Sequence, residues 1–344
     1  METPTNFTKN RLENQGNNTT GLGYPTTGLG YPTWIHTTTS EMGILYLGYF
    51  LLIMTSLFGN SVLIHIIRTR QHTKTATNRL ILNQACADVI TTLTSMTAMF
   101  TDSLFVTRWF SGTGSLAACR ILGLVNYLPP FCSVWTLTAI AVDRYFGVTR
   151  PLQPSPISHH IRLVIMGLWV WALASSAGMQ AMASLSFVGK HVYCVTDFSH
   201  VKLTAGNITA LCLLLLNFLV PLLVMAVLYS IVCWRLWSRD PPGEGANHER
   251  RHEEAMKTAK KVTRMMIVVV VLYVLCWLPF HFFVSLSSLH KISLPSYAVL
   301  KFIVWLSNAY SAINPFIYFS FNSHFKHELT VIFGKCCRRP KCCT

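Results

Sequence analysis

Residues 43–67 read GILYLGYFLLIMTSLFGNSVLIHII, and this stretch decides the fold class of the 344-residue chain. It contains no Asp, Glu, Lys or Arg. A helix crosses the hydrocarbon core of a bilayer with about 20 mostly apolar residues. A cleaved signal peptide is not expected, because the stretch starts too far along the chain, is too long and lacks a preceding basic flank. The stretch therefore predicts a membrane-spanning helix.

Similar apolar windows follow at 80–101, 120–142, 163–187, 204–233, 262–289 and 297–321. Helices buried in a soluble core keep a polar face, and most of these windows have none. The composition agrees, since 51% of the residues are hydrophobic and 12% are charged, whereas soluble domains carry about 25% charged residues. We therefore expect an all-α, membrane-embedded bundle of seven transmembrane helices over residues 43–322, and not a cytosolic enzyme.

The distribution of basic residues predicts the orientation of this bundle. With the N-terminus outside, 20 of the 28 Lys and Arg residues fall in the cytoplasmic loops and tail, and 8 fall on the other side. Cytoplasmic loops of membrane proteins carry such an excess. We expect a multi-pass plasma-membrane protein with an extracellular N-terminus and a cytoplasmic C-terminus. This topology accounts for the net charge of +15, so no nucleic-acid partner is expected.

The segments that flank the bundle predict covalent modifications. Residues 1–42 are polar, contain the repeat TGLGYPT at 20–26 and 27–33, and predict a disordered extracellular tail. Sequons in this tail predict glycosylation at Asn6, Asn17 and Asn18. Residues 323–344 predict an amphipathic helix on the cytoplasmic lipid surface, followed by paired cysteines. We expect palmitoylation of Cys336 and Cys337, since a zinc site, the alternative, would lack an accompanying His.

Asp88 is the only acidic residue well inside a predicted span. An ionisable group at the bilayer centre costs about 2.5–3.5 kcal/mol and normally faces the bundle interior. Two interpretations remain open. The carboxylate either hydrogen-bonds neighbouring helices for packing alone, or it forms an ion or proton site that changes with conformation. Asn60 and Asn314 are the expected polar partners.

Asp143 and Arg144, followed by Tyr145, end the third predicted span at its cytoplasmic boundary. They form either an ordinary interfacial ion pair or a switch that frees Arg144 to contact a partner when helices move. Prolines kink membrane helices, either statically or as hinges. Three later spans contain one each: Pro221, Pro279 and Pro315.

Cys119 and Cys194 are the only cysteines on the predicted extracellular side. Disulfides form and persist on that oxidising side of the membrane. We therefore expect a disulfide that joins the outer start of the third span to the loop between spans four and five.

Several motifs occur together in the order and at the spacing of one receptor family. They are Gly59-Asn60, Leu82 with Ala87-Asp88, Cys119 placed 25 residues before Arg144, Trp169, Pro221 with Tyr229, CWLP at 276–279 and NPFIY at 314–318. The chain resembles the rhodopsin-like (class A) G-protein-coupled receptors over roughly residues 43–337. The resemblance implies a receptor, without enzyme activity, that binds an extracellular ligand and activates a heterotrimeric G protein.

The resemblance also implies residue roles. The residues implied in activation and G-protein coupling are Asp143, Arg144, Tyr145, Tyr229, Pro279, Asn314, Pro315 and Tyr318. An allosteric sodium ion is implied at Asp88, Ser133, Ser311 and Asn314, although Tyr310 stands where the family often has Asn. No other cofactor or metal is expected.

Three further departures from the family pattern carry expectations. Ala259 replaces an acid that locks the arginine in some members, so basal activity is expected. Tyr273 stands where Phe is usual. Pro129-Pro130 lies in the middle of the third span and predicts a local distortion of that helix.

Two ligand classes are excluded by single positions. Asn308 stands where retinal receptors carry the Schiff-base lysine, and Asn126 stands where amine receptors carry an aspartate. The sixth span looks like that of peptide receptors, including the tachykinin, neuropeptide Y and galanin receptors. A neuropeptide ligand is therefore expected, with a lipid, odorant or other small non-amine ligand as the alternative.

The implied ligand pocket consists of Asn126, Tyr127, Trp277, Phe280, His281, Val284, Leu300, Val304 and Asn308. On the cytoplasmic side, the tail has only Ser323, Thr330 and Thr344 as hydroxyl residues. Arrestin recruitment through tail phosphorylation is therefore expected to be weak, or to use Ser and Thr residues elsewhere in the chain.

Overall fold

The computed structural model describes residues 39–69, 75–105, 109–150, 153–181, 183–188, 191–196, 203–238, 246–288 and 297–337. The predicted glycosylation sites Asn6, Asn17 and Asn18 lie outside these residues. The side chains of Cys336 and Cys337 also lie outside what is described, although their backbone ends the last helix.

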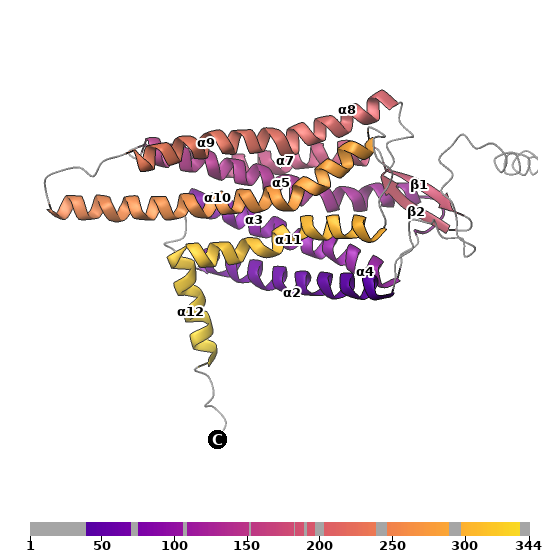
Figure 1. The fold of residues 1–344 in the computed structure, drawn as a ribbon, viewed down its shortest axis with the longest axis horizontal. Coiled ribbons are helices and arrows are strands. Elements are labelled where there is room, and N and C mark those ends of the chain that lie inside the picture. The colour runs from indigo at the N-terminus through magenta and orange to yellow at the C-terminus, as the bar shows by residue number, and fades with distance from the viewer. Residues whose placement is uncertain are drawn as a thin grey trace, which may run out of the picture.

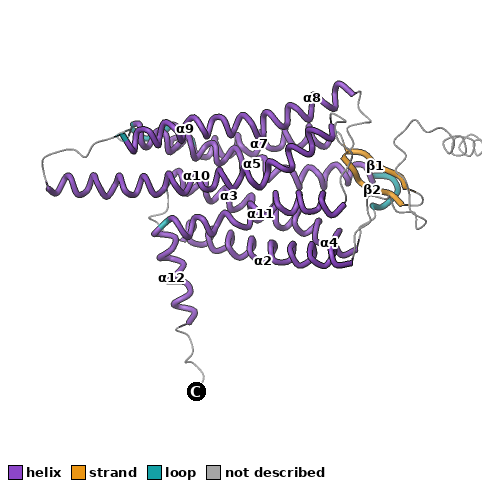
Figure 2. The backbone as a smooth tube through the Cα atoms, viewed as in Figure 1, coloured by secondary structure: helices purple, strands orange, loops and turns teal. Residues whose placement is uncertain are grey.

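Within these residues, seven helical rods lie alongside one another (Figures 1 and 2). In chain order the rods are α2 (Thr39–Thr69); α3 (Ala76–Thr91) with η3 (Thr92–Met96) and α4 (Thr97–Phe105); α5 (Ser115–Thr149); α7 (Ile161–Gln180); α8 (Leu203–Leu214) with η4 (Leu215–Leu219) and α9 (Val220–Trp237); α10 (Ala246–Ser288); and α11 (Tyr297–Phe321). The short α6 (Pro156–His159) joins α5 to α7. After α11, α12 (Ser323–Cys337) turns away from the bundle, as Figure 1 shows.

The seven rods occupy the predicted apolar windows. Five helices among the described residues are long and apolar enough to cross a membrane: Gly43–Thr69, Ser115–Thr149, Ile161–Gln180, Leu211–Trp237 and Glu253–Leu286. The second and seventh rods carry several buried polar residues, among them Asp88 and Asn314. Large apolar side chains on the outside, such as Ile44, Val170 and Leu223, are more than half exposed. Such an apolar surface fits lipid contact.

The core lies around α5, which packs against α3, α7 and α9. Its prolines Pro129 and Pro130 lie inside a helix assigned without a break over Ser115–Thr149. The distortion that these prolines predict therefore does not interrupt α5. Distortions occur instead in the two π-helical segments, η3 and η4, the second of which ends two residues before Pro221. Such one-turn π segments often lie at functional sites.

A two-stranded hairpin, absent from the sequence prediction, lies at the end of the bundle opposite α12 (Figure 1). Its strands are β1 (Ala183–Val188) and β2 (His191–Thr196), which pair antiparallel. The predicted fourth window, 163–187, was therefore too long, since α7 ends at Gln180 and a strand begins at Ala183. The alternation of Leu185 and Phe187 with serines is the strand signal in this stretch.

The predicted disulfide between Cys119 and Cys194 is present and spans 75 residues of sequence. It ties β2 to the first turns of α5, with a Cα–Cα distance of 5.7 Å. The backbone N–H of Trp109 adds a hydrogen bond of 2.8 Å to the Val192 carbonyl. Among the described residues, the disulfide joins the hairpin to α5, and this hydrogen bond joins it to the segment that precedes α5.

Candidate functional site

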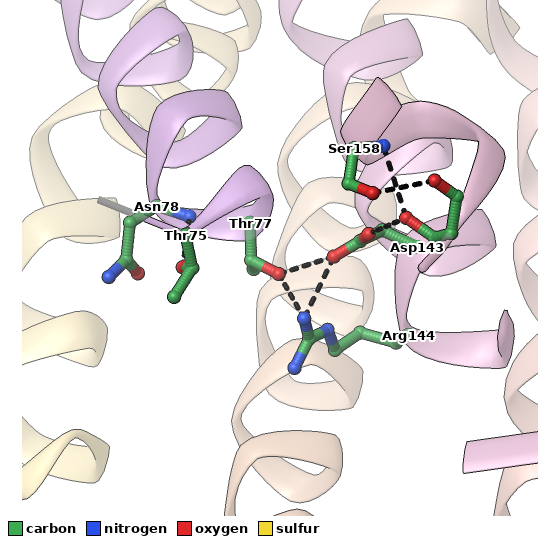
Figure 3. Close-up of polar contacts among 7 residues, drawn as sticks. Thr75, Thr77, Asn78, Asp143, Arg144 and Ser158 are labelled. Atoms are coloured by element: carbon green, nitrogen blue, oxygen red, sulfur yellow. Dashed lines mark hydrogen bonds and ion pairs between the residues drawn. The ribbon is translucent and has the colours of Figure 1, made fainter. Parts of the chain in front are cut away.

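Asp143, near the end of α5, is the centre of a polar cluster (Figure 3). Its Oδ2 atom lies 2.8 Å from Nη2 of Arg144 and also accepts a hydrogen bond from the Thr77 hydroxyl. Its Oδ1 atom accepts from the Ser155 hydroxyl. Arg144 donates a second hydrogen bond to Thr77 Oγ1. Residues from three elements therefore surround a carboxylate that is 5% exposed.

Helix caps place the two hydroxyl groups beside Asp143. Thr75 is the N-cap of α3 and accepts from the Asn78 N–H at 3.2 Å, which sets the start of the helix that carries Thr77. Ser155 is the N-cap of α6 and accepts from the Ser158 N–H at 3.2 Å. Both are residue types that N-caps prefer. Sequence reasoning missed Thr77 and Ser155, although the Ser-Pro start of α6 signals a helix there.

Arg144 also lines a cavity between α5 and α10. The cavity has a volume of about 500 Å³, and its wall consists of Arg144, Val148, Glu254, Ala255, Thr258, Ala259, Val262 and Thr263. Arg144 is the only basic residue in that wall, and its side chain is 31% exposed. Ala259, which stands where some family members carry an acid, lies in the same wall. The N-terminal part of α10 extends past the ends of α5 and α9 at this side (Figure 1).

The other predicted switch residues lie in the packed interior. Tyr229 and Tyr318 are 6% and 1% exposed and belong to the main hydrophobic core. The Tyr318 hydroxyl has no hydrogen-bond partner among the described residues. Tyr145 is half-buried and packs edge-on against Phe146. Pro279 and Pro315 lie inside α10 and α11, where they interrupt the helical hydrogen bonds.

A second polar cluster lies deeper, around Asp88. Asn314 Nδ2 donates to Asp88 Oδ2 at 3.1 Å. In the described part of the chain, the second carboxylate oxygen of Asp88, the Ser133 hydroxyl and Asn314 Oδ1 have no partner. Buried polar atoms without partners mark places where an ion or water is held. These oxygen atoms are the ligand type that hard cations prefer, so the residues fit the sodium ion that the sequence implied.

Neighbouring side chains complete this cluster. Asn60 Nδ2 donates to the backbone carbonyl of Ser311 at 3.1 Å. Pro315 has no N–H and cannot bond that carbonyl within the helix, so Asn60 replaces the missing donor. Tyr310, the departure from the family pattern, accepts from Gln84 Nε2 at 3.1 Å. Tyr310 therefore hydrogen-bonds a residue of α3 from its position on α11.

The candidate ligand pocket is centred on an aromatic group. The Trp277 ring lies 5.7 Å from Phe280 and 5.9 Å from His281, and Phe280 lies 6.4 Å from Tyr127. The structure thus brings together four of the predicted pocket residues. Phe218 of η4, which sequence reasoning missed, lies 4.6 Å from His281 between ring centroids.

The remaining predicted pocket residues lie on α5, α10 and α11. Asn126 Oδ1 and Asn308 Nδ2 are buried and have no partner within the described ranges. Leu300, Val304 and Asn308 are spaced four residues apart and so share one face of α11. Val284 is half-buried on α10. The predicted pocket residues therefore include aromatic and aliphatic side chains together with two amide groups that have no partner in the described part of the chain.

Comparisons with known proteins place these features in a family. The model of the family described as 7 transmembrane receptor (rhodopsin family) matches residues 59–318. The substance-P receptor of Mus musculus is 30% identical over 298 residues, which cover 84% of this chain and 70% of that protein. The human (Homo sapiens) substance-P receptor is 29% identical with the same coverage. The substance-K receptor of Canis lupus familiaris is 30% identical and covers 84% and 75% of the two chains.

Proposed function

The chain belongs to the rhodopsin family of seven-transmembrane receptors, and we propose that it binds an extracellular peptide and activates a heterotrimeric G protein. It is a multi-pass membrane protein. The excess of Lys and Arg in the loops on one side supports an extracellular N-terminus and a cytoplasmic C-terminus. As a receptor it would accelerate nucleotide exchange on its partner without making or breaking bonds itself.

The observation that carries this proposal is the position of Arg144. It lies at the edge of the cavity between α5 and α10 and is held by Asp143 and Thr77. When α10 moves away from α5, the cavity widens and the guanidinium becomes available to a G-protein segment. The switch is then an exchange of one set of hydrogen bonds for another, and a partner that binds the open arrangement more tightly shifts the population toward it.

The peptide ligand is supported by two independent points. The relatives reported above are receptors named for substance P and substance K. In addition, the unpaired amide groups of Asn126 and Asn308 face no buried acid in the described part of the pocket. A cationic amine would lack a counter-ion there, whereas the peptide groups of a neutral ligand segment can hydrogen-bond both amides.

Three further partners belong to the same proposal. Sodium would bind at Asp88, Ser133, Ser311 and Asn314 and favour the closed arrangement. Membrane lipids would hold α12 through palmitoyl groups on Cys336 and Cys337. Arrestin would bind weakly, because the tail offers few hydroxyl groups.

Second-messenger assays in cells that express the full chain test the proposal. Substance P and substance K are applied first, then a neuropeptide library, and calcium and cyclic AMP are measured. We expect a peptide response that is abolished by Arg144→Ala. The control variant Arg162→Ala, at an exposed arginine on α7, should retain the response. Silence toward all peptides at confirmed surface expression, with a response to lipids instead, would contradict the peptide ligand. A response that survives Arg144→Ala would contradict the switch.

A further inference from the structure

Pro221 leaves one backbone carbonyl of the fifth rod without its helical donor. Proline has no N–H, so it cannot bond the carbonyl four residues earlier, which belongs to Asn217. Asn217 lies in the π-helical segment η4 and is 1% exposed. A buried carbonyl without a donor is destabilising. A donor from another part of the chain can therefore stabilise this carbonyl.

Tyr273 of α10 supplies that donor. Its hydroxyl donates to the Asn217 backbone carbonyl at 3.3 Å, and its side chain is 2% exposed. The ring lies 6.0 Å from Phe218 on one side and 6.1 Å from Trp277 on the other, between centroids. Trp277 belongs to the candidate ligand pocket, so Tyr273 lies directly between that pocket and the cytoplasmic half of α10.

The hydroxyl of Tyr273 is a feature of this chain, because Phe is usual at this position in the family that it resembles. Phe would fill the same space and leave the Asn217 carbonyl without the donor. A similar replacement occurs in α11, where Asn60 serves the carbonyl freed by Pro315. The bond in α11 comes from Asn60, which belongs to the Gly59-Asn60 motif of the family. The bond from Tyr273 does not come from a family motif.

The location of Tyr273 couples its hydrogen bond to the movement of α10. Tyr273 lies six residues before Pro279, on the half of α10 that leads to the cavity beside Arg144. If that half moves away from the fifth rod about Pro279, the hydroxyl must leave Asn217. The bond therefore exists only while α10 is packed against η4 and α9.

We propose that the hydrogen bond from Tyr273 to Asn217 is a latch that holds α10 against the fifth rod and lowers basal signalling. Tyr273 acts as a positioning residue, since its described contacts are with Asn217, Phe218, Trp277 and Tyr310 of this chain. The latch offsets the absence of an acid at Ala259, which alone would favour the open arrangement. The proposal rests on the proposed function for its biological meaning, but the conformational equilibrium that it describes can be measured separately.

The matched control is Tyr49→Phe. Tyr49 is fully buried, and its hydroxyl also donates to a backbone carbonyl of another rod, that of Lys301 at 3.4 Å. The residue four positions after Lys301 is Trp305, which has a backbone N–H, unlike a proline. The Lys301 carbonyl therefore does not depend on Tyr49 for a donor. The two variants remove the same group from equally buried sites, and only Tyr273→Phe opens the proposed latch.

The experiment measures the distance between the ends of α9 and α10 in the purified full chain in lipid nanodiscs. Genetically encoded spin labels replace the exposed residues Ser238 and Lys257. In Tyr273→Phe we expect the ratio of long to short distances to rise about two- to tenfold, the factor that one buried hydrogen bond contributes. Tyr49→Phe should leave the ratio unchanged.

An unchanged ratio in Tyr273→Phe, or an equal rise in Tyr49→Phe, would overturn the latch. Nucleotide exchange on purified heterotrimeric G proteins, measured on the same samples without ligand, separates the two proposals. We expect Tyr273→Phe to accelerate exchange relative to the wild type. If no sample accelerates exchange on any heterotrimer, the proposed function fails, while the distance ratio still decides the latch.

Discussion

Asp143 shows, at the scale of single residues, how a charge is kept inside this protein. Burial of a carboxylate is costly unless the charge is paired and hydrogen-bonded. Here Arg144 pairs with it, and the Thr77 and Ser155 hydroxyls donate to its two oxygens. The same contacts restrain Arg144, which lines the cavity beside α10. Under the proposed function, their strength contributes to how often the switch opens at rest.

Asp143→Asn is expected to raise ligand-independent signalling about two- to tenfold. The substitution keeps the shape of the side chain and removes the charge that holds Arg144, which is 31% exposed; a partly exposed pair of this kind contributes about 1 kcal/mol. Inositol phosphate and cyclic AMP at matched surface expression provide the measurement. Glu253→Gln, which breaks the exposed pair with Lys257 at 2.7 Å, is the control. Equal basal signals in both variants would refute the restraint.

Asp88→Asn is expected to abolish the effect of sodium on stability. An ion that binds only the folded state raises the melting temperature. The wild-type chain should melt a few degrees higher in sodium chloride than in choline chloride of equal ionic strength, and Asp88→Asn should show no difference. Thermal unfolding in detergent measures this, with Glu253→Gln retaining the shift. A wild-type chain that melts equally in both salts would rule out sodium at these residues.

The sequence predicted Asp143, Arg144 and Asp88 as notable residues, but not what surrounds them. Thr77 lies 66 residues from Asp143 along the chain, and its contact exists only once α3 packs against α5. An apolar pattern predicts which helix a residue belongs to, whereas a contact between helices depends on how they are packed. The bond between Tyr273 and Asn217 was missed for the same reason.

At the scale of elements, the apolar windows predicted where helices occur because the bilayer requires uninterrupted apolar length. They failed where the chain leaves the bilayer. The fourth window absorbed β1, since an alternating strand is also rich in apolar residues. The π-helical segments were not predictable either, because their causes lie in local hydrogen bonds. Beside η3, for example, the hydroxyl of Thr97, the first residue of α4, donates to the Thr92 carbonyl at 2.9 Å.

Close packing between rods gives a prediction at this scale. A Cβ atom on Gly59 of α2 would lie 2.6 Å from Cγ of Pro315 in α11, closer than packed atoms approach. Gly59→Ala should therefore destabilise the receptor by about 1–3 kcal/mol, visible as a lower melting temperature in detergent. Gly178→Ala is the control, because nothing lies within 4 Å of its added Cβ and alanine favours the helix. Equal melting temperatures for the two variants would show that α2 and α11 can separate without cost.

At the scale of the whole molecule, the two ends of the bundle differ in construction. One end is closed by the hairpin, which the bond between Cys119 and Cys194 ties to α5. The other end carries the cavity beside Arg144 and the extended start of α10. Aromatic rings around Trp277 and Tyr273 lie between them. Ligand binding near the first end can therefore change the conformation of the second end through α10. This is a single continuous helix with Pro279 inside it.

The most direct test of the central claim is nucleotide exchange by purified components. The full chain in nanodiscs is mixed with purified heterotrimers of the main G-protein classes, with and without substance P. We predict that the wild type accelerates nucleotide exchange on at least one heterotrimer. With Arg144→Ala, the exchange rate should equal the rate measured without receptor. No acceleration by the wild type on any heterotrimer, or equal acceleration by Arg144→Ala, would contradict the account.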